Sequence, residues 1–433
     1  MAVTAAPLAR SLRMTASSLG LIAGKVASMG LGFLFWMVAA RVASATEVGL
    51  AAGAVSGMML CVQLGLLGVG AAFIAVYPGH PDRPALLDAA ISLALVVGFA
   101  AAAVFVGIAA VGLSELDILT SSAAYALWFL LAASAGTVGV VLDQISMALG
   151  RGDQVLSRNV LNGVVTLIPL GVFAALLGAP TSIELFSMWA IGAMAAFALA
   201  IRQLRGTAPE YRFRPRLPRL IARALVSDGL GHYALTCSER LPALILPIVI
   251  TETLSPELNA YWYSVWMMAW AAYVVPVSVG IGLFAEGSHR PASLRAASAK
   301  AARSALVIGG AVAVALGLGA PLALGALGPA YAAAGVTPLR ILVLGVVPLA
   351  LVHAYYAVAR VRKVLGEAIV TAAVTGLVGV GAVAVAGRSN GLAAMAWAWV
   401  AVQVLAAAWS ALRLRSIMGL LPAEQPESTA ALV

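Results

Sequence analysis

The first apolar stretch of the chain reads SSLGLIAGKVASMGLGFLFWMVAA and covers residues 17–40. At roughly 24 residues it is long enough to cross a bilayer as a helix, and it exceeds the roughly 7–15 residues of a signal-peptide core. We therefore expect it to be retained as a membrane helix. It carries one charge, Lys25, well inside the apolar run. A charge at that depth is costly to bury and usually has a function.

The composition extends this conclusion to the whole chain. Of the 433 residues, 62% are hydrophobic and 10% are charged, and the mean hydropathy is +1.01, which excludes a soluble domain of this length. We predict an all-α polytopic membrane protein. Apolar runs of about 20 residues predict twelve spans, at 17–40, 48–76, 86–113, 122–149, 155–177, 183–201, 224–250, 258–284, 303–327, 338–359, 366–386 and 391–412.

The distribution of lysine and arginine predicts the side that each loop faces. An even number of spans puts both termini on one side, and that side receives most of the 26 basic residues. Only Arg41, Arg340 and Arg388 fall on the opposite side. Both termini are therefore predicted to face the cytoplasm, in a cell (inner or plasma) membrane. The formal charge of +9 then reflects topology and attraction to anionic lipid, and we predict no nucleic-acid partner.

A polar segment divides the predicted spans into two groups of six. Residues 202–223 (RQLRGTAPEYRFRPRLPRLIAR) hold seven arginines and three prolines, and they predict a basic cytoplasmic linker. This linker separates an N-terminal lobe, 1–201, from a C-terminal lobe, 224–433. Its arginines suit two roles, the fixing of topology and the binding of anionic headgroups together with its aromatic residues.

The two halves of the chain also resemble each other. RVASATEVGL (41–50) matches TETLSPELNA (251–260) at a shift of 210, with Glu47 over Glu257, and ALGRGDQVL (148–156) matches AVARVRKVL (357–365) at a shift of 209. With six spans in each half, the two halves have the same orientation. We therefore predict about 12 transmembrane helices in two six-helix lobes related by a parallel repeat, an organisation found in transporters.

Short motifs relate the chain to a family. They are Ala40-Arg41 with Ser44, Glu47 and Gly49, then Ser255, Pro256, Glu257 and Tyr261, then Gly328-Pro329-Ala330-Tyr331, and finally the small residues of 391–394. In these the chain resembles the O-antigen translocase-like oligosaccharide and polysaccharide flippases of the MOP superfamily, which are related to MATE exporters and lipid II flippases. The resemblance covers essentially the whole chain. It implies a central cavity lined with cations, through which a polyprenyl diphosphate-linked glycan moves by alternating access.

The seventh predicted span carries an unusual group of charges. Asp228, His232 and Glu239 share one helical face, and Arg240 points away from it. Polar side chains along one face are expected to turn toward a bundle interior or a wet cavity, so we assign the three to ion coupling or gating and Arg240 to the substrate headgroup. The alternative is structural: Asp228 lies at the interface, Glu239 and Arg240 neutralise partners, and His232 is a packing residue.

Lys25 is the second candidate for headgroup binding. The resemblance implies a pyrophosphate ligand, and a lysine ammonium binds phosphate through charge-assisted hydrogen bonds. The alternative is an ion pair with an acidic residue such as Asp143 or Asp228. Asp143 and His353, near the inner ends of the fourth and tenth spans, are candidates for an inner gate, and helix-end capping is the alternative for both.

Several kinds of chemistry have no motif in the chain. There is no GxxxxGK[ST] loop, and the four histidines show neither HExxH nor another metal-ligand spacing. We predict no catalytic residues, no cofactor and no metal, and a protein that is not an enzyme. An integral membrane transferase is the weaker alternative, because such enzymes usually carry a loop carboxylate motif and the sparse pair Glu115 and Asp117 is a poor match to one.

These observations predict a transporter that flips a polyprenyl diphosphate-linked oligosaccharide from the cytoplasmic to the outer leaflet for cell-surface polysaccharide assembly. The expected partners are this substrate, membrane phospholipids, and glycosyltransferases or a polymerase of the same pathway. Two alternatives stay open. One is a MATE-type, cation-coupled exporter of drugs or metabolites, and the other is a non-transporting membrane scaffold for glycosyltransferases.

Overall fold

All regular secondary structure in the described part of the chain is helical. A computed structural model describes residues 24, 27–289 and 294–419, and no strand occurs among them. Within these ranges, ten helices are long and apolar enough to cross a membrane. The prediction of an all-α polytopic membrane protein is confirmed.

Contacts between helices divide the chain into two compact units, each described here by itself. Unit 1 is Met1–Tyr263 and unit 2 is Ser264–Val433. The boundary falls inside a helix, α9, and not in the linker, because α8 packs against α2 and α3. The predicted division into lobes 1–201 and 224–433 rests on a repeat and not on packing, and it stays a prediction.

The helices of both units alternate with short connections. Unit 1 holds a first helix described over Ala27–Val42, α2 (Ala45–Gly65), α3 (Val69–Val76), η1 (Tyr77–Gly79), α4 (Arg83–Gly112), η2 (Asp117–Leu119), α5 (Ala123–Ala148), α6 (Gly152–Val172), η3 (Phe173–Leu177), α7 (Ser182–Thr207), α8 (Arg219–Thr253) and the first turns of α9 (Pro256–His289). Unit 2 holds the rest of α9, α10 (Leu294–Gly325), α11 (Pro329–Leu342), η5 (Val343–Gly345), α12 (Val346–Val361) and α13 (Leu365–Gly419).

The predicted spans map onto these helices, and three of the differences concern breaks and the linker. The spans 366–386 and 391–412 form the two arms of α13, which breaks at Gly391, where φ is +68° and ψ is −167°. The span 48–76 is broken into α2 and α3. α7 continues to Thr207 and α8 begins at Arg219, so the non-helical part of the predicted linker is only 208–218, here called the strap. Helix-favouring arginine and glutamine residues after position 201 account for the longer α7.

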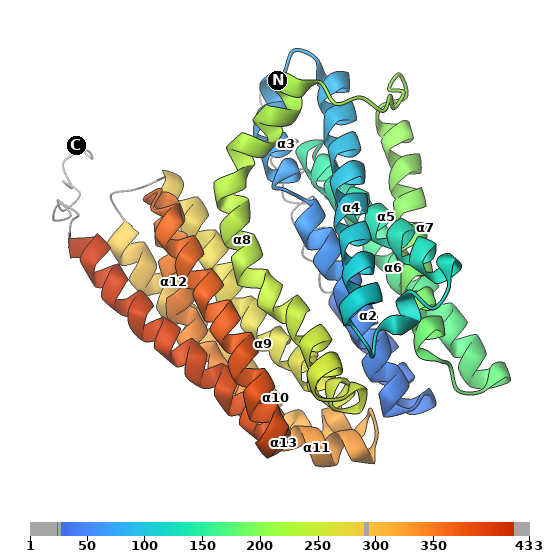
Figure 1. The fold of residues 1–433 in the computed structure, drawn as a ribbon. Helices are drawn as coiled ribbons and strands as arrows, with labels where there is room; N and C mark the ends of the chain where they lie inside the picture. Colours follow the sequence, from blue (N-terminus) through green and yellow to red (C-terminus); the bar gives the residue numbers. More distant parts are fainter. Residues whose placement is uncertain (1–23, 25–26, 290–293, 420–433) are drawn as a thin grey trace, which may run out of the picture. The chain divides into compact units, whose positions relative to one another are not determined.

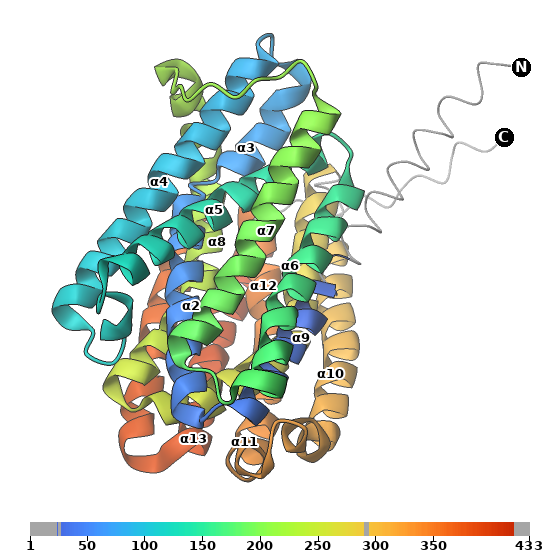
Figure 2. The ribbon, with the colours of Figure 1, turned by 90° about the vertical axis from the view of Figure 1, so that its right-hand side faces the viewer.

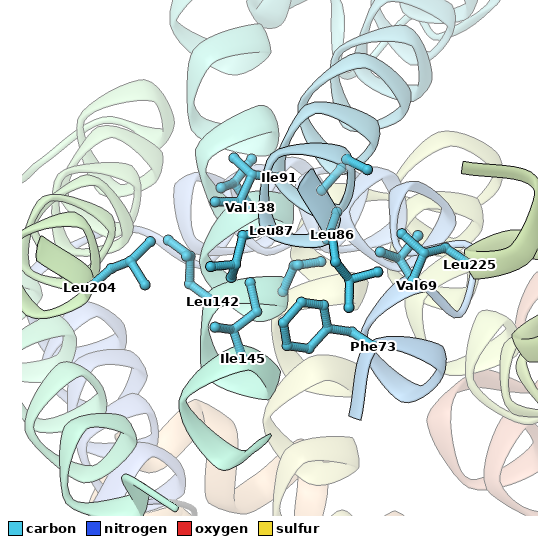
Figure 3. Close-up of a cluster of buried hydrophobic side chains, with 14 of the residues drawn as sticks. Val69, Phe73, Leu86, Leu87, Ile91, Val138, Leu142, Ile145, Leu204 and Leu225 are labelled. Atoms are coloured by element: carbon cyan, nitrogen blue, oxygen red, sulfur yellow. The ribbon is translucent and has the colours of Figure 1, made fainter. Parts of the chain in front are cut away.

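A buried apolar cluster of unit 1 lies close to the strap (Figure 3). Val69 and Phe73 of α3 meet Leu86 and Leu87 of α4, and Ile145 of α5 completes the contact. Leu204, Leu225 and the strap residue Tyr211 belong to the same cluster. The apolar packing therefore fixes the ends of α3, α4, α5, α7 and α8 together, and the strap with them.

Several helix boundaries recur at similar offsets in the two halves of the chain, in agreement with the predicted repeat. Ser44 Oγ accepts a hydrogen bond from the Glu47 N–H at 3.2 Å, and Ser255 Oγ, 211 positions later, accepts one from the Leu258 N–H at 3.1 Å. These two serines cap the N-termini of α2 and α9 in the same way. The first helix ends at Val42 and α8 ends at Thr253, which is again 211 positions.

Later in each half the same offset becomes 213. Gly150 and Lys363 both have a positive φ in the turn that follows a span, at +70° and +57°. Gly178 and Gly391, with φ of +98° and +68°, are also 213 positions apart. The offset of 211 between the first helix boundaries is one residue longer than the sequence match at 210. The offset of 213 between the later turns is four residues longer than the sequence match at 209. A shift of four is about one helical turn, so the sequence match kept the same helix face in alignment.

Candidate functional site

The polar residues predicted on the seventh span lie on α8. His232 and Glu239 are partly buried and Arg240 is exposed. Seven residues are close to two helical turns, so His232 and Glu239 share a face and Arg240 turns away from it. Lys25 and the side chain of Asp228 lie outside the described residues. The headgroup and coupling roles of all five residues stay predictions.

A tyrosine beside this face interrupts the neighbouring helix. The hydroxyl of Tyr233 donates to the carbonyl oxygen of Gln63, which also accepts the backbone N–H of Leu66 at 3.4 Å. In a regular helix that carbonyl would accept the N–H of Leu67, four residues later. Tyr233 of α8 is therefore inserted into the hydrogen-bond ladder of α2, a known cause of a helix break. Figure 1 shows α3 continuing beyond the end of α2 after this break.

Two glycines allow α8 to approach the break. Gly68 has a φ of +74°, and a Cβ on it would lie 2.9 Å from the Tyr233 Cβ. A Cβ on Gly229 would lie 2.7 Å from the Gly68 carbonyl oxygen. A further contact, 3.8 Å long, runs from the Gln63 Nε2 to the Cys237 Sγ. These contacts hold α8 close against the end of α2. The break therefore depends on the packing of two helices that lie far apart in the sequence.

Replacing Tyr233 by phenylalanine is expected to close the α2 ladder. Without the hydroxyl, the Leu67 N–H and the Gln63 carbonyl are left to bond each other, at a net change in stability of about 1 kcal/mol. We expect altered hydrogen-exchange protection in the peptide around residues 63–70. Tyr125→Phe, at an exposed position of α5, is the control and should leave that peptide unchanged. Equal exchange in Tyr233→Phe and wild type would show that the hydroxyl does not hold the break open.

An ion pair joins α5 and α6 at the end of unit 1 nearest the strap. Arg158 Nη2 lies 2.8 Å from Asp143 Oδ1, and the arginine side chain is 4% exposed while the aspartate is 29% exposed. The described partner of Asp143 is therefore an arginine of the next helix. The predicted role of Asp143 as an inner gate remains untested.

Hydrogen bonds extend this pair to a third helix. Arg158 Nη2 donates to Ser146 Oγ at 3.0 Å, and Ser146 Oγ donates to Gln154 Oε1 at 3.2 Å. Gln154 Nε2 then donates to Thr207 Oγ1 at 2.8 Å. The network ties α5, α6 and the last turn of α7 together, so it braces the end of unit 1 from which the strap leaves. α6 and α7 run side by side in Figure 2.

His353, the other predicted gate residue, belongs to unit 2. It lies on α12, partly buried, with its ring edge-on to Tyr356 at 5.9 Å between centroids. Two residues further along the chain, the Tyr355 hydroxyl donates to Glu367 Oε1 at 2.9 Å, and Arg413 Nη2 donates to Glu367 Oε2 at 2.6 Å. This second polar cluster joins α12 to both arms of α13. It contains no residue singled out from the sequence.

A small polar cavity lies between the first helix, α6 and α7. Its volume is about 30 Å³, enough for about two water molecules. It is lined by Ser28, Leu31, Gly32, Phe35, Asn159, Asn162, Gly163, Thr166 and Trp189. None of these lining residues carries a charge, so the cavity offers amide and hydroxyl groups without a carboxylate. Across the described residues, no group of three or more His, Cys, Asp or Glu side chains is arranged to hold a metal ion.

The sequence analysis did not identify Arg158 or Tyr233 as site residues, for different reasons. Arg158 has a signal: Asp143 and Arg158 lie equally far from the turn around Gly150, so an antiparallel helix pair brings them to the same level. Tyr233 has none, because the residue that it contacts is 170 positions earlier in the chain. Only the folded arrangement of α2 and α8 reveals it.

Solved structures of membrane transport proteins share this fold. The inward-facing form of a multidrug resistance MATE family transporter of the MOP superfamily matches at a TM-score of 0.67 and 16% identity, over 91% of this chain and 96% of that one. The lipid II flippase MurJ in an inward closed conformation matches at 0.69 and 14%, over 92% and 87%. A MOP superfamily transporter from Pyrococcus furiosus, reported with a binding pocket of reverse polarity, matches at 0.63 and 16%, over 94% and 96%.

No protein-family model and no curated protein sequence matches the chain. At identities of 13–16%, the likeness to the solved structures establishes a common fold. The predicted MATE/MOP-like fold is therefore confirmed.

Proposed function

We propose that this chain is a transporter that moves a polyprenyl diphosphate-linked oligosaccharide from the cytoplasmic to the outer leaflet of the cell membrane, with both termini in the cytoplasm. One observation carries the proposal. A single fold, covering 91% and 92% of this chain, is shared with a multidrug transporter and with a lipid II flippase. A fold common to both is suited to moving an amphiphile from one side of a bilayer to the other.

The charges favour an anionic cargo over a cationic one. Lys25 is a cation within an apolar run, and Arg240 is a second cation near the middle of α8. Each can donate charge-assisted hydrogen bonds to a pyrophosphate while the lipid tail stays in the bilayer. Asp228, His232 and Glu239 would bind the coupling ion, because carboxylates and imidazole at membrane depth can change protonation near neutral pH.

The break in α2 offers a place for this movement to occur. An unwound segment in a transport protein lets one half of a helix turn relative to the other. Residues 66–68 form such a segment, which begins three residues after the Gln63 carbonyl that Tyr233 of α8 bonds. We propose that α2 and α3 change their mutual angle at this point during the transport cycle, while the Asp143–Arg158 pair keeps α5 and α6 together.

The proposal is tested by native mass spectrometry of the gently purified protein. We expect a polyprenyl diphosphate glycan to co-purify with the wild type and to be lost from Lys25→Ala, because the headgroup loses its principal cation. Translocation by that variant should be abolished while its folding is retained. Lys300→Ala, which removes an exposed charge in α10, is the matched control and should keep the bound lipid.

One result would contradict the proposed substrate, and another would contradict the role of Lys25. If only bulk phospholipid accompanies both the wild type and the variant, the lipid-linked substrate is wrong. If Lys25→Ala retains the glycan and full transport, the substrate stands and Lys25 is removed from its binding site.

A MATE-type exporter is the second candidate, favoured by the structural match to the multidrug transporter. It predicts resistance to amphiphilic cations on overexpression, and it predicts dependence on Glu239 and Asp228 with no need for Lys25. A scaffold for glycosyltransferases predicts instead that charge changes in the spans are harmless and that changes in the linker are damaging. The same set of variants therefore separates the three functions.

A further inference from the structure

The strap is anchored to unit 1 by one buried carboxylate. Asp88 of α4 is 1% exposed, and its oxygens accept three hydrogen bonds from the strap. The donors are the Tyr211 hydroxyl at 2.7 Å, the Arg214 backbone N–H at 3.0 Å and the Arg216 Nε at 2.7 Å. Figure 1 and Figure 2 both show the strap passing from α7 to α8 across the end of unit 1.

Burial strengthens this anchor. Tyr211 is 8% exposed and packs in the apolar cluster with Leu204 and Leu225. Burial raises the pKa of its hydroxyl, and the hydrogen bond to Asp88 raises it further, so the group stays protonated and donates. Arg216 supplies the positive charge that a buried carboxylate requires. A segment without helix is therefore held in one conformation.

The anchored conformation turns an unusual set of side chains outward. Phe213 is 44% exposed, Leu217 is 40% exposed and Leu220 is 85% exposed. The guanidinium groups of Arg214, Arg219 and Arg223 alternate with them in the sequence and are exposed as well. These six residues are called the strap face. A linker that served only to set topology would need the arginines and not the apolar side chains.

The place of the strap face in the chain indicates what covers it. The span predicted from the apolar run in α8 begins at residue 224, so residues 219–223, with Arg219 and Arg223, extend beyond it. The strap face therefore lies where a spanning helix leaves the hydrocarbon, at the level of lipid headgroups. Aromatic and aliphatic side chains at that level enter the boundary between headgroups and acyl chains, and arginines bind the phosphates.

We propose that the strap face is a binding surface for anionic phospholipid, holding several headgroups of the adjacent leaflet against the end of unit 1. Phosphatidylglycerol is the representative ligand. Arg214, Arg219 and Arg223 bind the phosphates, while Phe213, Leu217 and Leu220 enter the apolar boundary. Asp88 is a positioning residue that keeps these groups on one surface. This inference does not depend on transport activity or on the cargo.

The experiment is a titration of the delipidated full-length protein in detergent with phosphatidylglycerol, read by native mass spectrometry and by thermal shift. Phosphatidylcholine and inorganic phosphate are titrated in parallel. The test variant is Arg214→Gln/Arg219→Gln/Arg223→Gln. The control is Lys300→Gln/Arg303→Gln/Arg362→Gln, which removes three exposed charges from unit 2.

We expect phosphatidylglycerol to raise the melting temperature and phosphatidylcholine not to do so. The test variant should bind phosphatidylglycerol about a hundredfold more weakly, from about fivefold for each of the three arginines lost. The control should bind like the wild type. Equal losses in both variants would reduce the effect to total charge and overturn the proposal. A shift of the same size with inorganic phosphate would also overturn it.

A second variant separates the anchor from the arginines. Asp88→Asn keeps all the strap-face residues but removes the charge that holds Arg216. We expect faster tryptic cleavage within the strap and weaker binding of phosphatidylglycerol. Unchanged lipid binding in a strap that is cleaved faster would show that anchoring is not needed and would remove the positioning role of Asp88.

Discussion

Replacing Gly49 by alanine is expected to destabilise the protein strongly, although the change adds only one methyl group. A Cβ on Gly49 would lie 1.7 Å from the carbonyl oxygen of Pro256, a backbone atom of α9 that cannot rotate away. The crossing is also fixed by Asn259, which is fully buried and donates from its Nδ2 to the Gly49 carbonyl at 2.8 Å. Overpacking of this kind costs about 1–3 kcal/mol, and more where backbone must move. Thermal unfolding of the purified variant measures the loss.

Gly30→Ala is the matched control for this substitution. Gly30 lies inside the first helix, and nothing is within 4 Å of the position that its Cβ would take. Alanine is favoured over glycine in a helix by about 1 kcal/mol, so this variant should be unchanged or slightly more stable. If Gly49→Ala unfolds at the same temperature as Gly30→Ala, α2 and α9 do not approach as closely as the structure indicates.

The surroundings of Gly49 show which contacts can be predicted from the sequence and which cannot. The turn motif at Ser44, Glu47 and Gly49 is visible in the sequence, and the cap that Ser44 makes with the Glu47 N–H follows from local rules. The reason for the glycine does not, because Pro256 lies more than 200 positions away. The turn motif therefore predicts the hydrogen bonds within the turn. It does not predict which helix packs against Gly49.

The two helix breaks differ in the same way, because one is predicted from the sequence and the other is not. The break at Gly391 is predicted because the polar residues of 388–390 interrupt the apolar run before it. The break between α2 and α3 is not predicted, because the run from 48 to 76 carries no charge and its only polar side chains are those of Ser56 and Gln63. The Tyr233 hydroxyl of α8 bonds the Gln63 carbonyl at this break, a contact that the sequence does not indicate. Composition therefore predicts the number of spans and their order. It does not predict a break that another helix imposes.

In the candidate site, the charged residues can be predicted from the sequence but their partners cannot. Charges within apolar runs identify Asp143, His232 and Glu239 from the sequence alone, since the cost of burying them is independent of the fold. Their partners depend on the fold. Arg158 pairs with Asp143, and Asp88, which reads as an ordinary helix-end residue, anchors the strap.

Replacing Asp143 by leucine is expected to be the most damaging single change among the described polar residues of unit 1. It leaves the guanidinium of Arg158, which is 4% exposed, without its carboxylate. An uncompensated buried charge costs about 3–5 kcal/mol. Arg158→Met should cost less, because the Asp143 carboxylate is 29% exposed and can be hydrated. Chemical or thermal unfolding of both variants in detergent measures the difference.

The double variant Asp143→Leu/Arg158→Met then separates a gate from a brace. Replacing both charges by apolar side chains removes the desolvation cost together with the attraction, so stability should return close to that of the wild type. If the pair only braces α5 against α6, transport should return with stability. If Asp143 acts as the inner gate, transport stays low in a protein of restored stability. A double variant as unstable as Asp143→Leu would contradict the coupling of the two residues and leave the stability of this end of unit 1 to the bonds of Ser146, Gln154 and Thr207.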